Sequence, residues 1–251
     1  MIDLFYFVSP NARKIHMALE ELGLAYDVRW VDISKGDQFD ADYLRVNPNG
    51  KIPAIVDHDG PDGKPIALFE SAAILLYLAE KSGQLLPADP GARWEAICWT
   101  VWQVANQGPG LGQATHFTTY APSHGHVVEY AQERFGTEAR RVYSVLEHQL
   151  AVRDYIAGEF SIADIACFPW TRLGKGHGIS LDEYPRVQAW SQRIAERPSA
   201  RAKIEDHRSE DAKNFRYTPE QYRRLFGAGG LTADAALPSS SCSTVSTTSK
   251  R

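Results

Sequence analysis

Cysteine is scarce in this chain of 251 residues, which contains only three. Cys98, Cys167 and Cys242 form neither a CxxC pair nor a spacing typical of a zinc site. A disulfide framework is therefore excluded as the organising principle, and a reducing compartment fits the composition. Cys98 and Cys167 fall within helical patterns, so we expect both to be small buried apolar residues. The eight histidines show no HExxH motif or other ligand spacing, and we expect no metal site.

Long apolar runs and an excess of positive charge are also missing. No stretch reaches the ~18 apolar residues that a membrane-spanning helix needs, and the longest candidate, residues 72–79, ends at Glu80 and Lys81. Residues 1–8 lack the basic region and the apolar length of a secretory signal. The net charge of −4 argues against a nucleic-acid-binding protein. We therefore expect a soluble cytoplasmic protein with no nucleic-acid or membrane partner.

Residues 1–83 alternate strand and helix signals. The apolar run 2–8 predicts a buried strand, and residues 26–33 predict a second one. Between them, Ser9 and the proline after it indicate a helix start, and Gly23 indicates the helix end. A strand–helix–strand unit with such short connections pairs its two strands in parallel.

A hairpin and a further helix follow in the same part of the chain. Residues 53–56 and 66–69 are short strand signals separated by a turn-rich segment, which favours antiparallel pairing. Glu70 and Ser71 then precede a helix that is apolar nearly all round, so we expect it to be covered on several sides. The sequence therefore predicts a small sheet with helices packed on it.

The chain is helical in character from residue 90 to 204. Residues 139–150 keep one apolar face for three turns, and almost no strand signal interrupts the pattern. Ser161 begins another helix, and Asp164, three residues later, can complete a capping box. We place the boundary between the two parts near residues 83–90.

The C-terminal residues divide into two segments. Residues 205–226 form an extension that could cover a functional site or lie on the surface. Residues 227–251 contain glycine and alanine and then mostly serine and threonine. Such a composition cannot bury enough apolar surface to offset the entropy of ordering, so we expect a disordered tail.

The two-part architecture resembles the cytosolic glutathione transferases. That family joins a thioredoxin-like α/β N-terminal domain to an all-α C-terminal domain, and the likeness extends over roughly residues 1–204. The segments that resemble its thioredoxin-like half are residues 9–11, 46–54 and 68–75. Residues 161–166 resemble the capping box that is buried in its helical half.

One class within this family is most similar. The Nu class, which includes bacterial glutathione-dependent disulfide-bond reductases, resembles this chain in several short segments of the helical part. These segments are residues 102–103, 108–109, 111–113, 116–117 and 133–135.

The resemblance implies that the thiol of glutathione binds at the start of the first helix. The N-terminus of a helix lowers a thiol pKa, and Asn11 and Ser9 could each donate a hydrogen bond to the sulfur. Ser9 could also be only a helix cap, a role that is compatible with such a bond. Tyr6 is the competing activator, because other classes use a tyrosine near the end of the first strand. No cysteine stands at this helix start, so the reactive sulfur is expected to come from the ligand.

The peptide part of glutathione needs a backbone edge to pair with. By resemblance, Pro53 follows a cis peptide bond and leaves the backbone of Ile52 free to bind the cysteinyl unit like an added strand. An ordinary trans proline at a strand start is the alternative.

The charged ends of glutathione need polar partners. The resemblance assigns the γ-glutamyl end to Ser71, at a helix N-terminus, and to Glu70, which can accept from the ammonium group. It assigns the glycyl carboxylate to Lys51 and Gln38. A plain helix start and solvated loop residues are the respective alternatives.

A second substrate would lie against the helical part. Residues 108–110, Gly-Pro-Gly, are expected to interrupt a long helix and to widen a pocket lined by Trp102, His116 and Phe117. The alternative is a local kink that lets two helices pack. Arg134 could reach the carboxylate of a second glutathione by a bidentate contact.

The resemblance implies a homodimeric, glutathione-dependent disulfide-bond oxidoreductase. Glutathione, reduced or oxidised, would be the co-substrate, and its thiolate would exchange with a small-molecule disulfide before a second glutathione resolves the mixed species. Two alternatives stay open at this point. The same thiolate could be conjugated to an electrophile, as in a glutathione S-transferase, or the chain could be a binding or regulatory module with little activity.

Overall fold

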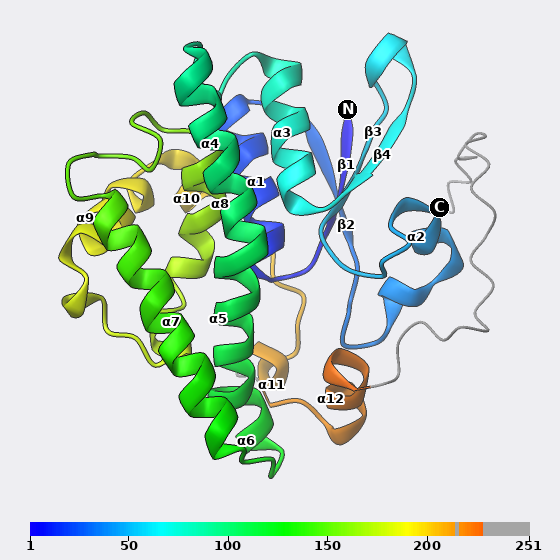
Figure 1. Ribbon diagram of the computed structural model, residues 1–251. Helices are drawn as coiled ribbons and strands as arrows, with labels where there is room; N and C mark the ends of the chain where they lie inside the picture. Colours follow the sequence, from blue (N-terminus) through cyan, green and yellow to red (C-terminus); the bar gives the residue numbers. More distant parts are fainter. Residues whose placement is uncertain (214–215, 228–251) are drawn as a thin grey trace.

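The computed structural model describes residues 1–213 and 216–227 (Figure 1). A four-stranded sheet with the strand order β2-β1-β3-β4 lies beside a larger group of helices, and this arrangement confirms the predicted fold class. The predicted disorder of the tail 227–251 concerns residues that, apart from Gly227, lie outside the described ones. In the described part, no helix is long and apolar enough to cross a membrane.

The sheet is built as the strand signals predict. Strand β1 (Ile2–Tyr6) pairs in parallel with β2 (Tyr26–Trp30) and antiparallel with β3 (Ala54–Asp57), which in turn pairs antiparallel with β4 (Ile66–Phe69). The parallel unit and the hairpin are therefore confirmed.

Strands β1 and β2 both end earlier than their apolar runs. After the hydrogen bond from Val31 N to Tyr6 O, the two segments leave the sheet. Phe7 and Val31 are nonetheless almost fully buried. The runs continue past the strands because these side chains pack into the core from connecting segments.

Helix α1 (Pro10–Leu22) begins and ends at the predicted signals. The hydroxyl of Ser9 accepts a hydrogen bond from Ala12 N at 3.1 Å, and Gly23 ends the helix with a left-handed φ of 62°. A left-handed residue at this position is favourable for glycine because glycine has no Cβ. The helix packs against both the sheet and the helical part, so its first turn lies where the two parts meet (Figure 1).

Two further helices, α2 and α3, belong to the first part, and the helices from α4 on form the second part and the C-terminal extension. Helix α3 (Ser71–Ser82) follows the hairpin and packs against α1 and α8, so it is covered on several sides as expected. The other α-helices are α2 (Ala41–Val46), α4 (Pro90–Trp102), α5 (Gly108–Thr115), α6 (Ala121–Ser123), α7 (Glu129–Gln149), α8 (Ile162–Thr171), α9 (Pro185–Ala195), α10 (Pro198–Arg201), α11 (Glu210–Lys213) and α12 (Pro219–Phe226).

The Gly-Pro-Gly segment does not interrupt its helix, so that prediction was wrong. Helix α4 runs through a π-helical segment, Gln103–Gln107, directly into α5, and the backbone stays right-handed helical at both junctions. The wider π-helical turn precedes Pro109, where the missing N–H and the proline ring would disturb a regular α-helix. The proline is thus accommodated by a change of helix type.

Helix α8 is fixed by a buried carboxylate. Asp164 accepts hydrogen bonds from the backbone N–H groups of Ile156 and Ser161, each at 3.0 Å, and from the indole N–H of Trp190 at 2.8 Å. The predicted capping box is confirmed. Burial raises the pKa of Asp164 to about 6 although these hydrogen bonds favour the carboxylate.

The two described cysteines differ in exposure. Cys167, on α8, is fully buried as predicted. Cys98 is exposed on α4, so its predicted burial was wrong. Residues 94 to 101 of α4 carry an apolar face that stays exposed among residues 1–213 and 216–227, and Cys98 lies on that face.

We expect Asp164→Ala to lower the free energy of unfolding by about 3 kcal/mol, because three buried donors lose their acceptor at once. Urea denaturation near neutral pH would measure the loss. Ser161→Ala removes the helix cap and the long hydroxyl bond to Asp164 but leaves the carboxylate in place. It is the control and should cost about 1 kcal/mol. A loss for Asp164→Ala no larger than that of the control would contradict this account of α8.

Candidate functional site

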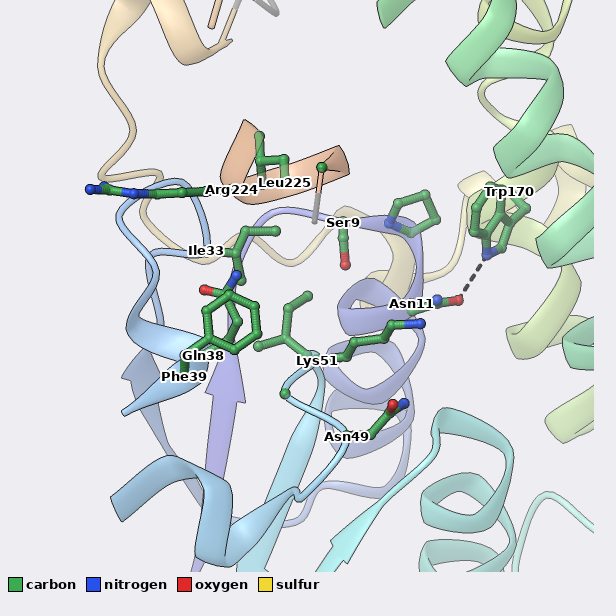
Figure 2. A pocket seen from close by; sticks show the side chains of 14 residues that line it. Ser9, Asn11, Ile33, Gln38, Phe39, Asn49, Lys51, Trp170, Arg224 and Leu225 are labelled. Carbon is green, nitrogen blue, oxygen red and sulfur yellow. Dashed lines mark hydrogen bonds between the residues drawn. The ribbon is translucent and has the colours of Figure 1, made fainter. Parts of the chain in front are cut away.

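A cavity of about 450 Å³ opens where the N-terminus of α1 meets the helical part (Figure 2). Four segments and one side chain form its wall. They are residues 9–11 at the start of α1, residues 33–39, residues 49–52, residues 224–227 and Trp170 of α8. Of the predicted site residues, the structure brings Ser9, Asn11, Gln38, Lys51 and Ile52 together here.

The amide of Asn11 has a defined orientation. Its Oδ1 accepts a hydrogen bond from the indole Nε1 of Trp170 at 2.9 Å, drawn as the dashed line in Figure 2. Since the oxygen is held by the indole, the NH₂ group of the same amide is left as a donor beside the cavity. Ser9 lies one residue before the helix, where its hydroxyl already caps α1 and keeps its own proton to donate.

Trp170 is a site residue that sequence reasoning missed. It stands six residues after the Asp164 position, at the C-terminal end of α8, and nothing in the local pattern separates it from a core aromatic. Its ring packs against α5, where a Cβ added at Gly112 would lie 3.4 Å from Trp170 Cη2. On another side it stacks on His177, with ring centroids 6.3 Å apart. Trp170, the side chain that orients Asn11, is therefore in close contact with both α5 and His177.

The wall segment of residues 49–52 leads into a cis peptide bond between Ile52 and Pro53, as the resemblance implied. The carbonyl of Lys51, just before it, accepts hydrogen bonds from Tyr43 Oη and from Asn47 Nδ2. These two bonds hold the loop, and Ile52 lies against the cavity two residues before the β3–β4 pairing begins. Pro53 itself is buried behind the cavity wall.

Two polar residues predicted to bind a carboxylate lie below the cavity in Figure 2. Gln38 is 5% exposed, and its Oε1 has no hydrogen-bond partner among the described residues. Lys51 is exposed and extends along the cavity. A buried amide atom without a partner is costly, so this part of the wall is suited to a polar ligand.

Helix α12 forms the opposite wall, which settles where the C-terminal extension lies. Arg224 and Leu225 line the cavity, and Arg224 Nη1 donates to the carbonyl of Lys35 at 3.0 Å. The other side of α12 packs on aromatic rings, with Tyr222 stacked 4.0 Å from His124. Residues 219–226 therefore cover the site, which the sequence had left open.

The predicted γ-glutamyl residues lie beyond the cavity wall, at the start of α3. Glu70 is exposed and has a φ of 68°, a region that residues with a side chain rarely adopt. Ser71 is 6% exposed, and its Oγ accepts a hydrogen bond from Lys14 Nζ at 3.1 Å. The strained backbone at Glu70 places both residues at the N-terminal, positive end of the α3 dipole, with Glu70 exposed and Ser71 buried.

The predicted second-substrate residues also lie outside this cavity wall. Trp102 packs against Trp99, with ring centroids 5.0 Å apart. Phe117 stacks on Phe135 at 5.5 Å. His116 contacts Phe226 of α12 at 4.9 Å, so it supports the helix that covers the cavity.

Two further predicted residues, Arg134 and Tyr6, also lie outside the cavity wall. Arg134 is exposed on α7 and lies 4.0 Å from Glu138. Tyr6, the competing thiol activator, is 6% exposed and packs against Trp30. Burial raises the pKa of Tyr6, and its surroundings are those of a core aromatic. Among the described residues, no group of three or more His, Cys, Asp or Glu side chains could hold a metal ion.

Comparisons with known proteins agree with this geometry. A family model for the N-terminal domain of glutathione S-transferases matches residues 8–81, and one for the C-terminal domain matches residues 113–198. The disulfide-bond oxidoreductase YfcG of Escherichia coli is 45% identical over 217 residues, which is 84% of this chain and 100% of YfcG. The disulfide-bond oxidoreductase YghU of the same organism is 38% identical over 249 residues, covering 89% of this chain and 84% of YghU.

A comparison with solved structures also finds glutathione transferases. A glutathione transferase from Pseudomonas putida, with one glutathione disulfide bound per subunit, superposes with a TM-score of 0.77. It is 38% identical, and the match covers 80% of this chain and 89% of that one. A glutathione transferase from Burkholderia graminis, with two glutathione molecules per subunit, has a TM-score of 0.74 at 39% identity, covering 79% and 85% of the chains. The chain therefore belongs to the glutathione transferase family.

Proposed function

We propose that this protein is a glutathione-dependent disulfide-bond oxidoreductase of the Nu class. The observation that carries the proposal is the oriented amide of Asn11 at the start of α1, where no cysteine is present. A helix N-terminus with an amide donor and a hydroxyl donor stabilises a thiolate, and the thiolate must then be that of bound glutathione. Relatives named disulfide-bond oxidoreductases support the choice of reaction.

The chemistry is two successive thiol–disulfide exchanges. The glutathione thiolate, held by Asn11 and Ser9, attacks one sulfur of a small disulfide, forms a mixed disulfide and releases the other half as a thiolate. A second glutathione thiolate then attacks the glutathione sulfur, giving glutathione disulfide and releasing the rest of the substrate. Each released thiolate takes up a proton from water, which balances the ionisation of each glutathione. The relative that holds glutathione disulfide and the one that holds two glutathione molecules are consistent with room for both.

We assign the rest of the first glutathione along the cavity wall. The backbone of Ile52, held by the cis bond to Pro53, would pair with the cysteinyl unit. Gln38, with its unpartnered amide oxygen, and Lys51 would meet the glycyl end. The γ-glutamyl end would lie at the start of α3, where Ser71 would bind its carboxylate and Glu70 its ammonium group.

The second substrate would lie between α12 and the helical part. His116 would contribute indirectly, because its contact with Phe226 supports the position of α12. We propose Trp102, Phe117 and Arg134 as further residues on this side, with Arg134 available to the carboxylate of a second glutathione. We also propose that residues 1–83 and 90–204 are the two domains of the protein and that it works in the cytoplasm, where glutathione is reduced.

The two cysteines among the described residues are poorly placed for this chemistry. Burial raises the pKa of the Cys167 thiol, so it stays protonated. Cys98 is exposed on α4 and is not part of the cavity wall. Cys242 lies outside the described residues.

A paired assay separates the proposed reaction from conjugation, the runner-up. We expect turnover of hydroxyethyl disulfide with glutathione, and Asn11→Ala should lower it by about a hundredfold, because a charge-assisted hydrogen bond to the thiolate is lost. A triple variant without cysteines, Cys98→Ser, Cys167→Ala and Cys242→Ser, is the control and should keep its turnover. A large preference for a chloronitrobenzene over the disulfide, or an equal loss in the cysteine-free control, would sink the proposed reaction. Calorimetry with reduced and oxidised glutathione would identify a binding module without activity.

The bond from Trp170 makes a separate prediction. Trp170→Phe keeps a ring in place but removes the N–H that orients Asn11, so we expect the thiol pKa of bound glutathione to rise and kcat/KM to fall about tenfold. An ultraviolet titration of the thiolate measures the pKa. Trp99→Phe removes an indole N–H that is not in the cavity wall, and it should change neither quantity. If both variants behaved alike, Trp170 would have no orienting role.

We propose that the protein is a homodimer that uses the exposed face of α4. Trp94, Cys98 and Val101 follow one another at helical spacing, and the side chains of Trp94 and Val101 are 65% and 49% exposed. Trp94→Glu should therefore convert dimers to monomers, as measured by light scattering after gel filtration. Val152→Glu changes an even more exposed apolar side chain elsewhere and should leave the mass unchanged. A dimer that persists in Trp94→Glu would exclude this face.

A further inference from the structure

A lysine is buried at the interface between the sheet-containing part of the fold and the helical part. Lys14 lies on α1 and is 0% exposed. Its Nζ donates a hydrogen bond to Ser71 Oγ at 3.1 Å, at the start of α3, and another to Gln103 Oε1, in the π-helical segment of the helical part. One ammonium group therefore joins α1, α3 and the helix that follows α4.

The ammonium group of Lys14 takes part in no ion pair among the described residues. Two ionisable groups lie close enough to affect the pKa of Lys14. They are Glu70, whose side chain is exposed and whose negative charge favours the ammonium form, and the Cys167 thiol of α8, which burial keeps neutral. Burial lowers the pKa of Lys14 to about 7. An ammonium group in such surroundings is costly unless an anion comes close.

The surroundings of Lys14 also hold a polar atom without a partner. Gln103 is fully buried, and its Nε2 has no hydrogen-bond partner among the described residues. Its Oε1 is already used by Lys14. The group around Lys14 thus has an excess of donors and of positive charge, which is the complement of a carboxylate.

Ser71 connects the group around Lys14 to the place where a ligand would bind. Because Lys14 donates to its Oγ, the hydroxyl proton of Ser71 must point to another acceptor. Ser71 is the first residue of α3, where free backbone N–H groups already favour a negative charge. The γ-glutamyl carboxylate of glutathione, bound there, would accept from Ser71 and bring the missing negative charge.

We propose that Lys14 is a positioning residue for the γ-glutamyl end of glutathione. Lys14 acts on the ligand through Ser71, and Gln103 of the helical part holds Lys14 in place. This inference rests on the proposed function, since it needs glutathione in that subsite. Glutathione binding is then coupled to protonation of Lys14. The bound carboxylate raises the pKa of the ammonium, so affinity is highest below the pKa of the free protein and falls as the pH rises through neutrality.

The test is calorimetric titration of the full chain with S-methylglutathione, in which the thiol is blocked. We expect the Kd of the wild type to rise between about pH 6 and about pH 8.5 by a factor about ten times larger than the factor for Lys14→Met. A tenfold difference corresponds to a shift of one unit in the pKa of Lys14 on binding. The amino group of the ligand also titrates, but it does so equally for every variant and cancels in the comparison. Lys81→Met, at the other end of α3, is the matched control and should keep the pH dependence of the wild type.

Lys14→Gln separates the charge from the hydrogen bond and serves if Lys14→Met does not fold. The glutamine amide can still donate to Ser71 but carries no charge. We therefore expect the Kd of this variant for S-methylglutathione to change less with pH than the Kd of the wild type. If Lys14→Gln follows the pH profile of the wild type, the proposal for Lys14 is wrong. If the wild type itself does not bind S-methylglutathione, the proposed function fails instead, so the two failures can be told apart.

Discussion

The hydrogen bond from the Trp170 indole to the Asn11 carbonyl oxygen connects the two parts of this fold at the point where its chemistry is proposed. A primary amide can rotate and present either its oxygen or its NH₂ group, and only the second can stabilise a thiolate. The bond fixes that choice from outside α1. The N-terminal part therefore carries the donor, but the helical part determines its orientation.

The position of Trp170 in turn depends on how α8 is held. The carboxylate of Asp164 binds the start of α8 to the segment before it and to Trp190, so the helix has little freedom to slide or rotate. At the other end of α8, the Trp170 ring packs closely against Gly112 of α5. A buried network that is fully hydrogen-bonded specifies one arrangement, and here that arrangement reaches the cavity through one aromatic side chain.

Polar groups also join the two parts elsewhere along α1. Besides Lys14 and its partners, Arg13 donates to the backbone carbonyl of Ala200 at 2.7 Å. An interface of apolar side chains alone could shift by a fraction of a turn at little cost, whereas misplaced buried donors would lose their partners. The site between the two parts needs such accuracy, because donors from both must converge on one small ligand. Helix α12 adds a wall whose position depends on ring contacts with Tyr222 and on the bond from Arg224 to Lys35.

The sequence by itself determined what depends on neighbouring residues. The Ser9 cap, the Gly23 stop, the hairpin and the capping box at Asp164 are local signals, and each is found as predicted. The family resemblance, together with the absence of a cysteine at the start of α1, pointed to Ser9 and Asn11 as candidate residues. Only the tertiary structure decided that Trp170 orients Asn11, that Lys14 donates to Ser71 from a buried position, and that α12 covers the cavity. Each of these depends on a contact between residues more than fifty positions apart, and no periodicity or spacing along the chain reports which distant side chains will meet.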